Sequence, residues 1–128
     1  MSPNVKKRGL EVIDFLAIAQ AGGERKPAWG LQTEDLNLNL VVLEEGGGIA
    51  EHTNDEVDVL IAGIAGEGQI IVEEGSYPMR AGQAMVLPKG TPRSIGCAGN
   101  RFVYLTCHRR RSGIWPQGLS RPEAHSGR

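Results

Sequence analysis

The amino-acid sequence predicts an all-β fold, a single small barrel or sandwich. Short apolar runs recur along the chain with turn signals between them, at the spacing of about 8–12 residues that sandwiches and barrels show. Eighteen of the 128 residues are glycine, and many of them punctuate those runs. The run at 36–43, LNLNLVVL, alternates leucine with asparagine at its start, which is the period of a half-buried strand.

Length and charge set further limits. A chain of 128 residues has the size of one domain and can bury a core without disulfides or metals. The formal net charge of −1 gives no field that favours nucleic acid or an anionic membrane. No apolar run reaches the roughly 18 residues that a membrane helix needs, and no secretion signal follows the basic start. We expect a cytoplasmic protein with Cys97 and Cys107 as free thiols, although neighbouring strands could hold the two at bridging distance.

In the N-terminal extension, residues 1–32, the sequence predicts one helix between two short strands. Asp14 is a candidate N-cap and Gly22 a candidate stop for a short helix over DFLAIAQAGG. We expect a short strand at 11–14 before it and an edge strand at 28–33 after it.

The sequence predicts that residues 33–108 form the barrel. Residues 109–128 are expected to form a basic, loose C-terminal tail. The expected strands are 36–43, 57–62, 69–72, 77–80, 84–87, 94–96 and 102–107, with turns at 44–48, 73–76 and 98–100. In the first strand, the leucines share one face. Asn37 and Asn39 share the other, which faces either solvent or a polar cavity.

Two stretches hold polar residues at regular spacing beside strand signals. The first is Gly46–Gly66, GGGIAEHTNDEVDVLIAGIAG, and the second is Gly82–Cys97, GQAMVLPKGTPRSIGC. They resemble the two motifs of the cupin superfamily, G-x5-H-x-H-x3,4-E-x6-G and G-x5-P-x-G-x2-H-x3-N. The frame of glycines and proline is matched in full, and fifteen residues separate the motifs, as in small single-domain bacterial cupins. The resemblance implies a double-stranded β-helix, a small jelly-roll barrel.

The metal-ligand positions of the family are degenerate in this chain. In the family, two His and one Glu of the first motif and the His of the second bind a divalent metal. The matching residues here are His52, Asn54, Val59 (or Asp58 with the shorter spacing) and Arg93, and Cys97 stands at the final Asn position. Arginine cannot ligate, and its charge would repel a cation. We therefore predict no metal. If one binds, His52 and Asp58, with Asp55 or Glu56, are the alternative ligands, although adjacent strand residues cannot all point inward.

The same positions suggest a binding site. If the resemblance places His52, Asn54 and Arg93 inside the barrel, Arg93 offers a planar fork for a carboxylate or phosphate. Asn54 can donate or accept, and His52 can be a base or a hydrogen-bond partner. The sequence thus favours a small anionic or carbonyl ligand held without metal. Two alternatives stay open: Arg93 could pair with an acid such as Asp58, or Cys97 could be a nucleophile beside His52.

Two functional classes remain open. The first is a small-molecule-binding cupin of unknown specificity. The second is a metal-dependent cupin enzyme, an isomerase, decarboxylase or dioxygenase acting on a small metabolite. The resemblance also implies a homodimer, with the apolar face of 36–43 and the stretch 10–18 as candidate contacts. The charge run 109–111 is expected to be solvated, so nucleic acid is not an expected partner. Trp115 is expected to fasten the tail to the barrel or to a second subunit.

Overall fold

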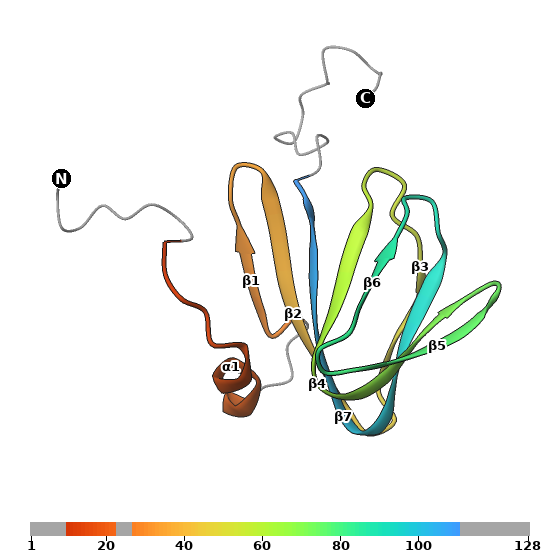
Figure 1. Ribbon diagram of the computed structural model, residues 1–128, viewed down its shortest axis with the longest axis horizontal. Helices are drawn as coiled ribbons and strands as arrows, with labels where there is room; N and C mark the ends of the chain where they lie inside the picture. The colour runs from red at the N-terminus through yellow and green to blue at the C-terminus, as the bar shows by residue number, and fades with distance from the viewer. Residues whose placement is uncertain (1–9, 23–26, 111–128) are drawn as a thin grey trace, which may run out of the picture.

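The computed structural model describes residues 10–22 and 27–110. They form one short helix and a seven-stranded antiparallel sheet that folds into two layers, open at one end like a V (Figure 1). The predicted all-β barrel is therefore confirmed. The elements are α1 (Phe15–Ala21), β1 (Trp29–Gln32), β2 (Leu36–Glu44), β3 (Gly48–His52), β4 (Val59–Val72), β5 (Gly75–Arg80), β6 (Ala84–Leu87) and β7 (Arg93–Arg109).

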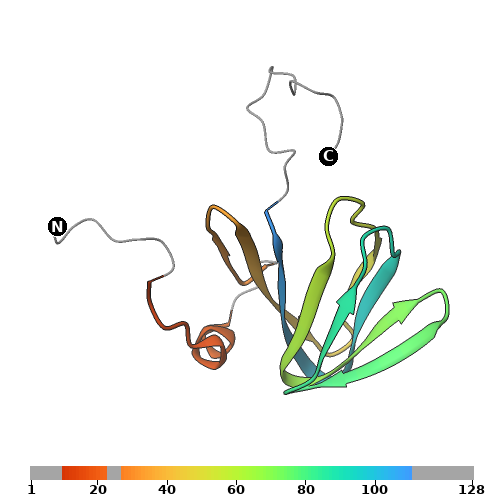
Figure 2. The same cartoon turned by 45° about the horizontal axis from the view of Figure 1, so that its top comes forward.

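The two longest strands, β4 and β7, belong to both layers. The first half of β4 pairs with the second half of β7 in the layer β1-β2-β7-β4-β6. The second half of β4 pairs with the first half of β7 in the layer β3-β7-β4-β5. The register between them shifts at 63–65 and again at 66–68, where both strands bend. Figure 2 shows the layers apart at one end and joined through these strands at the other.

The core lies between the layers because alternate residues of each strand point inward. In β2 and β7 the inward pairs include Leu43 with Phe102 and Val41 with Tyr104. The rings of Phe102 and Tyr104 stack at 5.1 Å. The other buried members of this core are Val57, Val59, Ile61, Ile70, Met79, Leu87 and Ile95.

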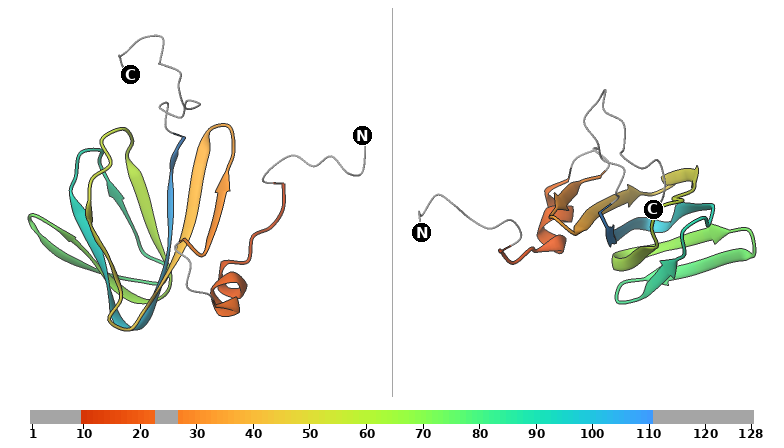
Figure 3. Two further views of the ribbon diagram at one scale, coloured as in Figure 1. Left: turned by 180° about the vertical axis from the view of Figure 1, so that it is seen from behind. Right: turned by 90° about the horizontal axis from the view of Figure 1, so that it is seen from above.

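Helix α1 covers the outer face of one layer, at the opposite end of the molecule from β5 (Figure 3). The Asp14 carboxylate caps it by accepting from the Ala17 N–H at 3.0 Å, and Gly22 ends it with a φ of 81°, as predicted. Ala19 packs with Leu40 and Val103 in a second cluster. With seven residues, α1 is too short to cross a membrane, and the described part of the chain has no other helix.

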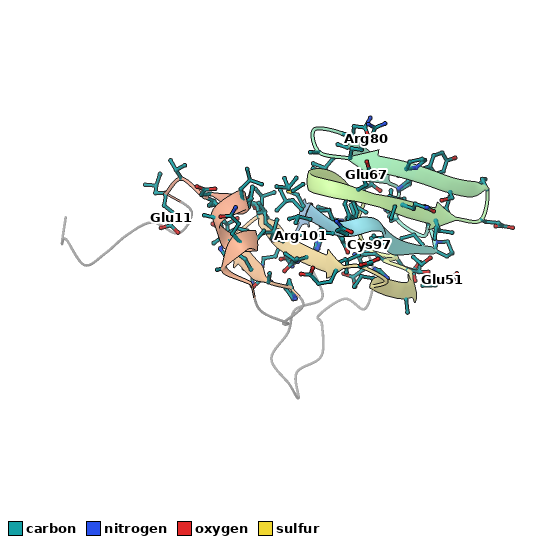
Figure 4. The ribbon with its side chains drawn as sticks, turned by 90° about the horizontal axis from the view of Figure 1, so that it is seen from below. Glu11, Glu51, Glu67, Arg80, Cys97 and Arg101 are labelled. Atoms are coloured by element: carbon teal, nitrogen blue, oxygen red, sulfur yellow. The ribbon has the colours of Figure 1, made fainter. Side chains whose placement is uncertain are left out.

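Arg101 ties α1 to the barrel. Its Nη2 donates to the carbonyl of Ala19 at 2.5 Å. Seen from below, Arg101 lies between α1 and the strands β4 and β5 (Figure 4). The Phe15 ring adds an edge contact to Trp29, with centroids 5.6 Å apart. The N-terminal segment is thus held by a hydrogen bond and by apolar contacts.

Several predicted boundaries were wrong. The expected strand at 11–14 is absent: no described strand pairs with it, and Val12 is 98% exposed. The expected turn at 98–100 is part of β7, which bends there as it passes from one layer to the other. The expected strands at 57–62 and 69–72 join into one bent strand, β4. Strand β3 was not predicted, because a three-glycine approach is typical of a turn. The tail beyond 110, with Trp115, lies outside the described residues.

The glycine frame yields a stability prediction. Gly66 and Gly46 both have positive φ, 74° and 80°. A Cβ on Gly66 would overlap the backbone carbonyl of Arg101, whereas a Cβ on Gly46 would meet nothing within 4 Å. Gly46→Ala should therefore cost about 1–2 kcal/mol of unfolding free energy for its left-handed backbone alone. Gly66→Ala should cost more than about 4 kcal/mol, because backbone must also move. Urea denaturation measures both, and equal losses would contradict this account.

Candidate functional site

A cavity of about 280 Å³ lies between the two layers of the barrel. Aliphatic side chains from four strands form much of its wall, namely Val41, Ile49, Ile61 and Ile95. Polar groups also reach it, namely Asn39, His52, Arg93, Tyr104 and Thr106, and Pro27 completes the lining. An apolar cavity with a few convergent polar groups is the usual form of a small-molecule site.

A second, more polar cavity of about 190 Å³ adjoins the first. The two share four lining residues, Asn39, His52, Arg93 and Thr106. The smaller cavity adds Thr53, Asn54, Val59 and His108. We therefore treat them as an apolar and a polar chamber of one site. A larger surface hollow of about 630 Å³ at the β1–β2 turn contains none of the motif residues.

The change from apolar to polar follows the pairing of β2 with β7. Their inward-facing partners, taken along the strands, are Leu43–Phe102, Val41–Tyr104, Asn39–Thr106 and Asn37–His108. The first two pairs belong to the core, and Asn39 and Thr106 line both chambers. The sequence left open whether the asparagines face solvent or a polar cavity, and Asn39 lines the cavity. The barrel has an apolar base and a polar mouth.

Arg93 brings a permanent positive charge into this site. It is the first residue of β7, lies opposite His52 of β3, lines both chambers and is 4% exposed. Its Nη1 donates to the carbonyl of Thr91 at 3.2 Å. Burial raises the pKa of Tyr104, and the positive charge of Arg93 offsets part of that rise. A buried charge is costly in free energy unless groups around it compensate.

His52 lies at the end of β3 and lines both chambers, although its side chain is largely exposed. Its Nδ1 lies 3.1 Å from the carbonyl oxygen of Ala50. A carbonyl can only accept, so Nδ1 carries the proton in this contact. In the neutral ring, Nε2 then has the lone pair and can accept a hydrogen bond or a proton.

Asn54 has a structural task that the sequence did not indicate. Its Oδ1 accepts from the backbone N–H groups of Glu56 at 3.0 Å and Val57 at 3.2 Å. Its backbone carbonyl accepts from Gly90 at 2.7 Å, which joins the loops of the two motifs. Asn54 is buried and lines the polar chamber. The group that it can offer to a ligand is therefore its side-chain NH₂.

The residues present do not fit the metal of the cupin family. At the ligand positions, the Asn54 oxygen holds backbone, Val59 is part of the core, and Arg93 is a cation. Asp58 is exposed, accepts from the Lys89 N–H at 2.9 Å, and lines neither chamber. Within residues 10–22 and 27–110, no three or more His, Cys, Asp or Glu gather as metal ligands would. A metal-free site stays a prediction.

Sequence reasoning missed the inward-facing residues that β7 gives to the site, namely Tyr104, Thr106 and His108. The signal was present, since they alternate with outward residues and share the face of Phe102, a core residue. Cys97 behaves differently. Its thiol lies 3.2 Å from the Gly99 carbonyl, and it lines neither chamber with His52.

Because Tyr104 is buried, we predict that the folded chain loses stability at high pH. An unfolded tyrosine ionises near pH 10, whereas burial raises the pKa of Tyr104 in the folded chain. Above about pH 10 the unfolded chain therefore binds fewer protons, and Tyr104 should lower the unfolding free energy by about 1.4 kcal/mol per pH unit. Tyr104→Phe should lack this part of the slope in urea denaturation at pH 9–11. Tyr77→Phe, at an exposed position, should retain it, and identical slopes for wild type and Tyr104→Phe would contradict the assignment.

Comparisons with known proteins agree with this architecture. The profile of the family described as "Cupin domain" matches residues 39–108. A cupin-2 domain-containing protein of Shewanella frigidimarina superposes with a TM-score of 0.64 at 20% identity, covering 77% of this chain and 95% of that one. Protein NMB1881 of Neisseria meningitidis gives 0.67 at 20% identity, covering 78% and 100%. TT1209 of Thermus thermophilus gives 0.66 at 19% identity, covering 80% and 99%.

These solved structures share the fold with this chain, and at such identity they say nothing of its ligand. Among curated proteins, none matches the sequence. The family profile spans both motifs and more than half of the chain. The chain therefore belongs to the cupin domain family.

Proposed function

We propose that this cupin binds a small organic carboxylate inside the barrel, without a metal. The observation that carries the proposal is Arg93, a cation that is 4% exposed and lines both chambers. A guanidinium is planar and can bind both oxygens of a ligand carboxylate at once. Such contacts are stronger in a desolvated site than in water.

The size and chemistry of the apolar chamber narrow the ligand class. A volume of about 280 Å³ holds about nine non-hydrogen atoms if each takes roughly the 30 Å³ of a water molecule. The aliphatic wall favours a ligand with a short hydrocarbon part over a bare inorganic anion. Small aliphatic carboxylates meet both conditions, whereas inorganic phosphate meets only the charge condition.

The polar chamber supports a defined orientation. His52 can accept a hydrogen bond through Nε2, and Asn54 can donate through its NH₂. With the carboxylate at Arg93, the hydrocarbon part would lie against Ile61 and Ile95 in the apolar chamber. We propose binding as the function, because the described residues include no group of three or more His, Cys, Asp or Glu that could hold the metal of the family's enzymes.

The proposal predicts binding of butyrate that depends on Arg93. Arg93→Met keeps the length of the side chain but removes the charge, so the butyrate dissociation constant should rise about 10- to 100-fold, as for a hydrogen bond to a charged group. Arg93→Lys keeps the charge without the fork and should fall between the two. Titration followed by NMR or calorimetry measures the constants. Arg80→Met, at an exposed position on β5 (Figure 4), is the matched control and should bind as wild type does.

Two results would overturn the proposal. One is equal butyrate affinity in wild type and Arg93→Met, with melting temperatures showing that both are folded. The other is stoichiometric metal in protein purified without chelator or affinity metal, lost in His52→Ala. That result would favour the metal-dependent enzyme instead. Inorganic phosphate, titrated in parallel, should bind more weakly than butyrate.

We also propose that the chain forms a homodimer through the outer face of the layer that carries β6. The residues Leu38, Cys107, Leu60 and Val86 are successive partners across β2, β7, β4 and β6 and share this face. Leu60 is 37% exposed and Val86 58% exposed. A two-fold interface uses the same patch on both copies, so a continuous apolar row without charges is complementary to itself.

The dimer proposal predicts a response to charge in this row. Leu60→Lys should shift the chain from dimer to monomer in size-exclusion chromatography with light scattering, because two lysines would face each other across the two-fold axis. Ile71→Lys, at a position on the other layer that is 41% exposed, should leave the dimer intact. A monomeric wild type would refute the proposal.

A further inference from the structure

The polar chamber contains a histidine, His108, that the proposed function does not use. His108 lies near the end of β7, faces inward with Tyr104 and Thr106, and is 9% exposed. It lines the polar chamber but not the apolar one. Neither motif of the family contains it, and no role was assigned to it from the sequence.

The hydrogen bond of His108 determines which ring nitrogen is left to accept from a ligand. Its Nδ1 lies 2.8 Å from the backbone carbonyl of Arg109, and a carbonyl can only accept. Nδ1 therefore carries the proton, and Nε2 of the neutral ring has the lone pair. Among the described residues, no partner donates to this Nε2. The polar chamber thus contains an imidazole acceptor.

The surroundings hold that imidazole in place. The Arg109 side chain donates to the carbonyl of Glu56 at 3.2 Å, which ties the end of β7 to the loop that follows Asn54. Asn54 in turn holds that loop through the N–H groups of Glu56 and Val57. The strand and the loop together therefore hold His108 in an orientation in which its Nε2 can accept a hydrogen bond.

We propose that the carboxylate ligand also carries a hydroxyl group, which donates a hydrogen bond to Nε2 of His108. Arg93 begins β7 in one layer and His108 lies near its end in the other, and both line the polar chamber. A hydroxycarboxylate would span the two layers, with its carboxylate at Arg93 and its hydroxyl at His108. The ligand class is thus a short-chain hydroxy acid, and this inference rests on the proposed function above.

The test compares butyrate with 2-, 3- and 4-hydroxybutyrate, which differ only in the presence and place of the hydroxyl. At pH 8, at least one isomer should bind wild type about five- to tenfold more tightly than butyrate. His108→Asn keeps a donor for the Arg109 carbonyl but has nothing at the place of Nε2. It should therefore lose the preference for the hydroxy acid over butyrate. His108→Gln can place an amide oxygen near Nε2 and should retain part of the preference.

The outcomes separate this inference from the function on which it rests. If butyrate binds in an Arg93-dependent way but no hydroxybutyrate binds more tightly, the hydroxyl proposal is wrong and the binding proposal stands. A preference that persists unchanged in His108→Asn would also overturn it, because another group must then accept the hydroxyl. If neither butyrate nor any hydroxybutyrate binds, both proposals fail. Should His108→Asn not fold, the wild-type comparison and His108→Gln still decide between these results.

Discussion

The pairing of β4 with β7 is the constraint on which the rest of this structure depends. Each strand enters both layers, so the two inner faces are positioned by the same pair of chains. The bend between the halves needs backbone that approaches closely, and Gly66 sits where a side chain would overlap the neighbouring strand. If that bend were lost, the layers would separate and the chambers with them.

The same pairing decides where the polar groups of the site lie. β7 begins with Arg93 in one layer and ends beyond His108 in the other, so a single strand supplies polar groups to the polar chamber from both layers. Between them, Phe102 and Tyr104 fill the base as part of the core. The polar mouth and the apolar core are therefore successive segments of one strand. This explains how a chain of modest size can hold a charged side chain at low exposure without disturbing its core.

Arg93 also changes what a cupin site can do. At this place the family has an imidazole that binds a cation, and this chain has a cation of its own. In the function proposed above, the site therefore binds a negative group where the family binds a positive ion. Asn54 also differs from a metal ligand, because its Oδ1 accepts hydrogen bonds from the backbone N–H groups of the following loop. The fold is kept, while the chemistry of its interior differs.

The sequence by itself determined the family, the frame of glycines and proline, the helix from its Asp14 cap to Gly22, and most strands of the barrel. These features are local: a cap, a turn or an alternating run depends on residues close together in the chain. The sequence also identified His52 and Arg93, which the structure brings face to face across β3 and β7. It could not show that two pairs of predicted strands are single bent strands, because a bend and a turn have the same glycine-rich pattern.

Only the tertiary structure decided which polar residues meet. Asn39 lies on β2, whereas Thr106 and His108 lie on β7, far away in the sequence. Their common chamber exists because β2 pairs with β7 in one particular register. A shift of one residue would turn each of these side chains to the opposite face. The tertiary structure likewise assigned the Asn54 oxygen to the backbone and the Nδ1 of His108, a residue of the polar chamber, to the carbonyl of Arg109. Those assignments depend on hydrogen bonds that form only after the loops and strands have packed.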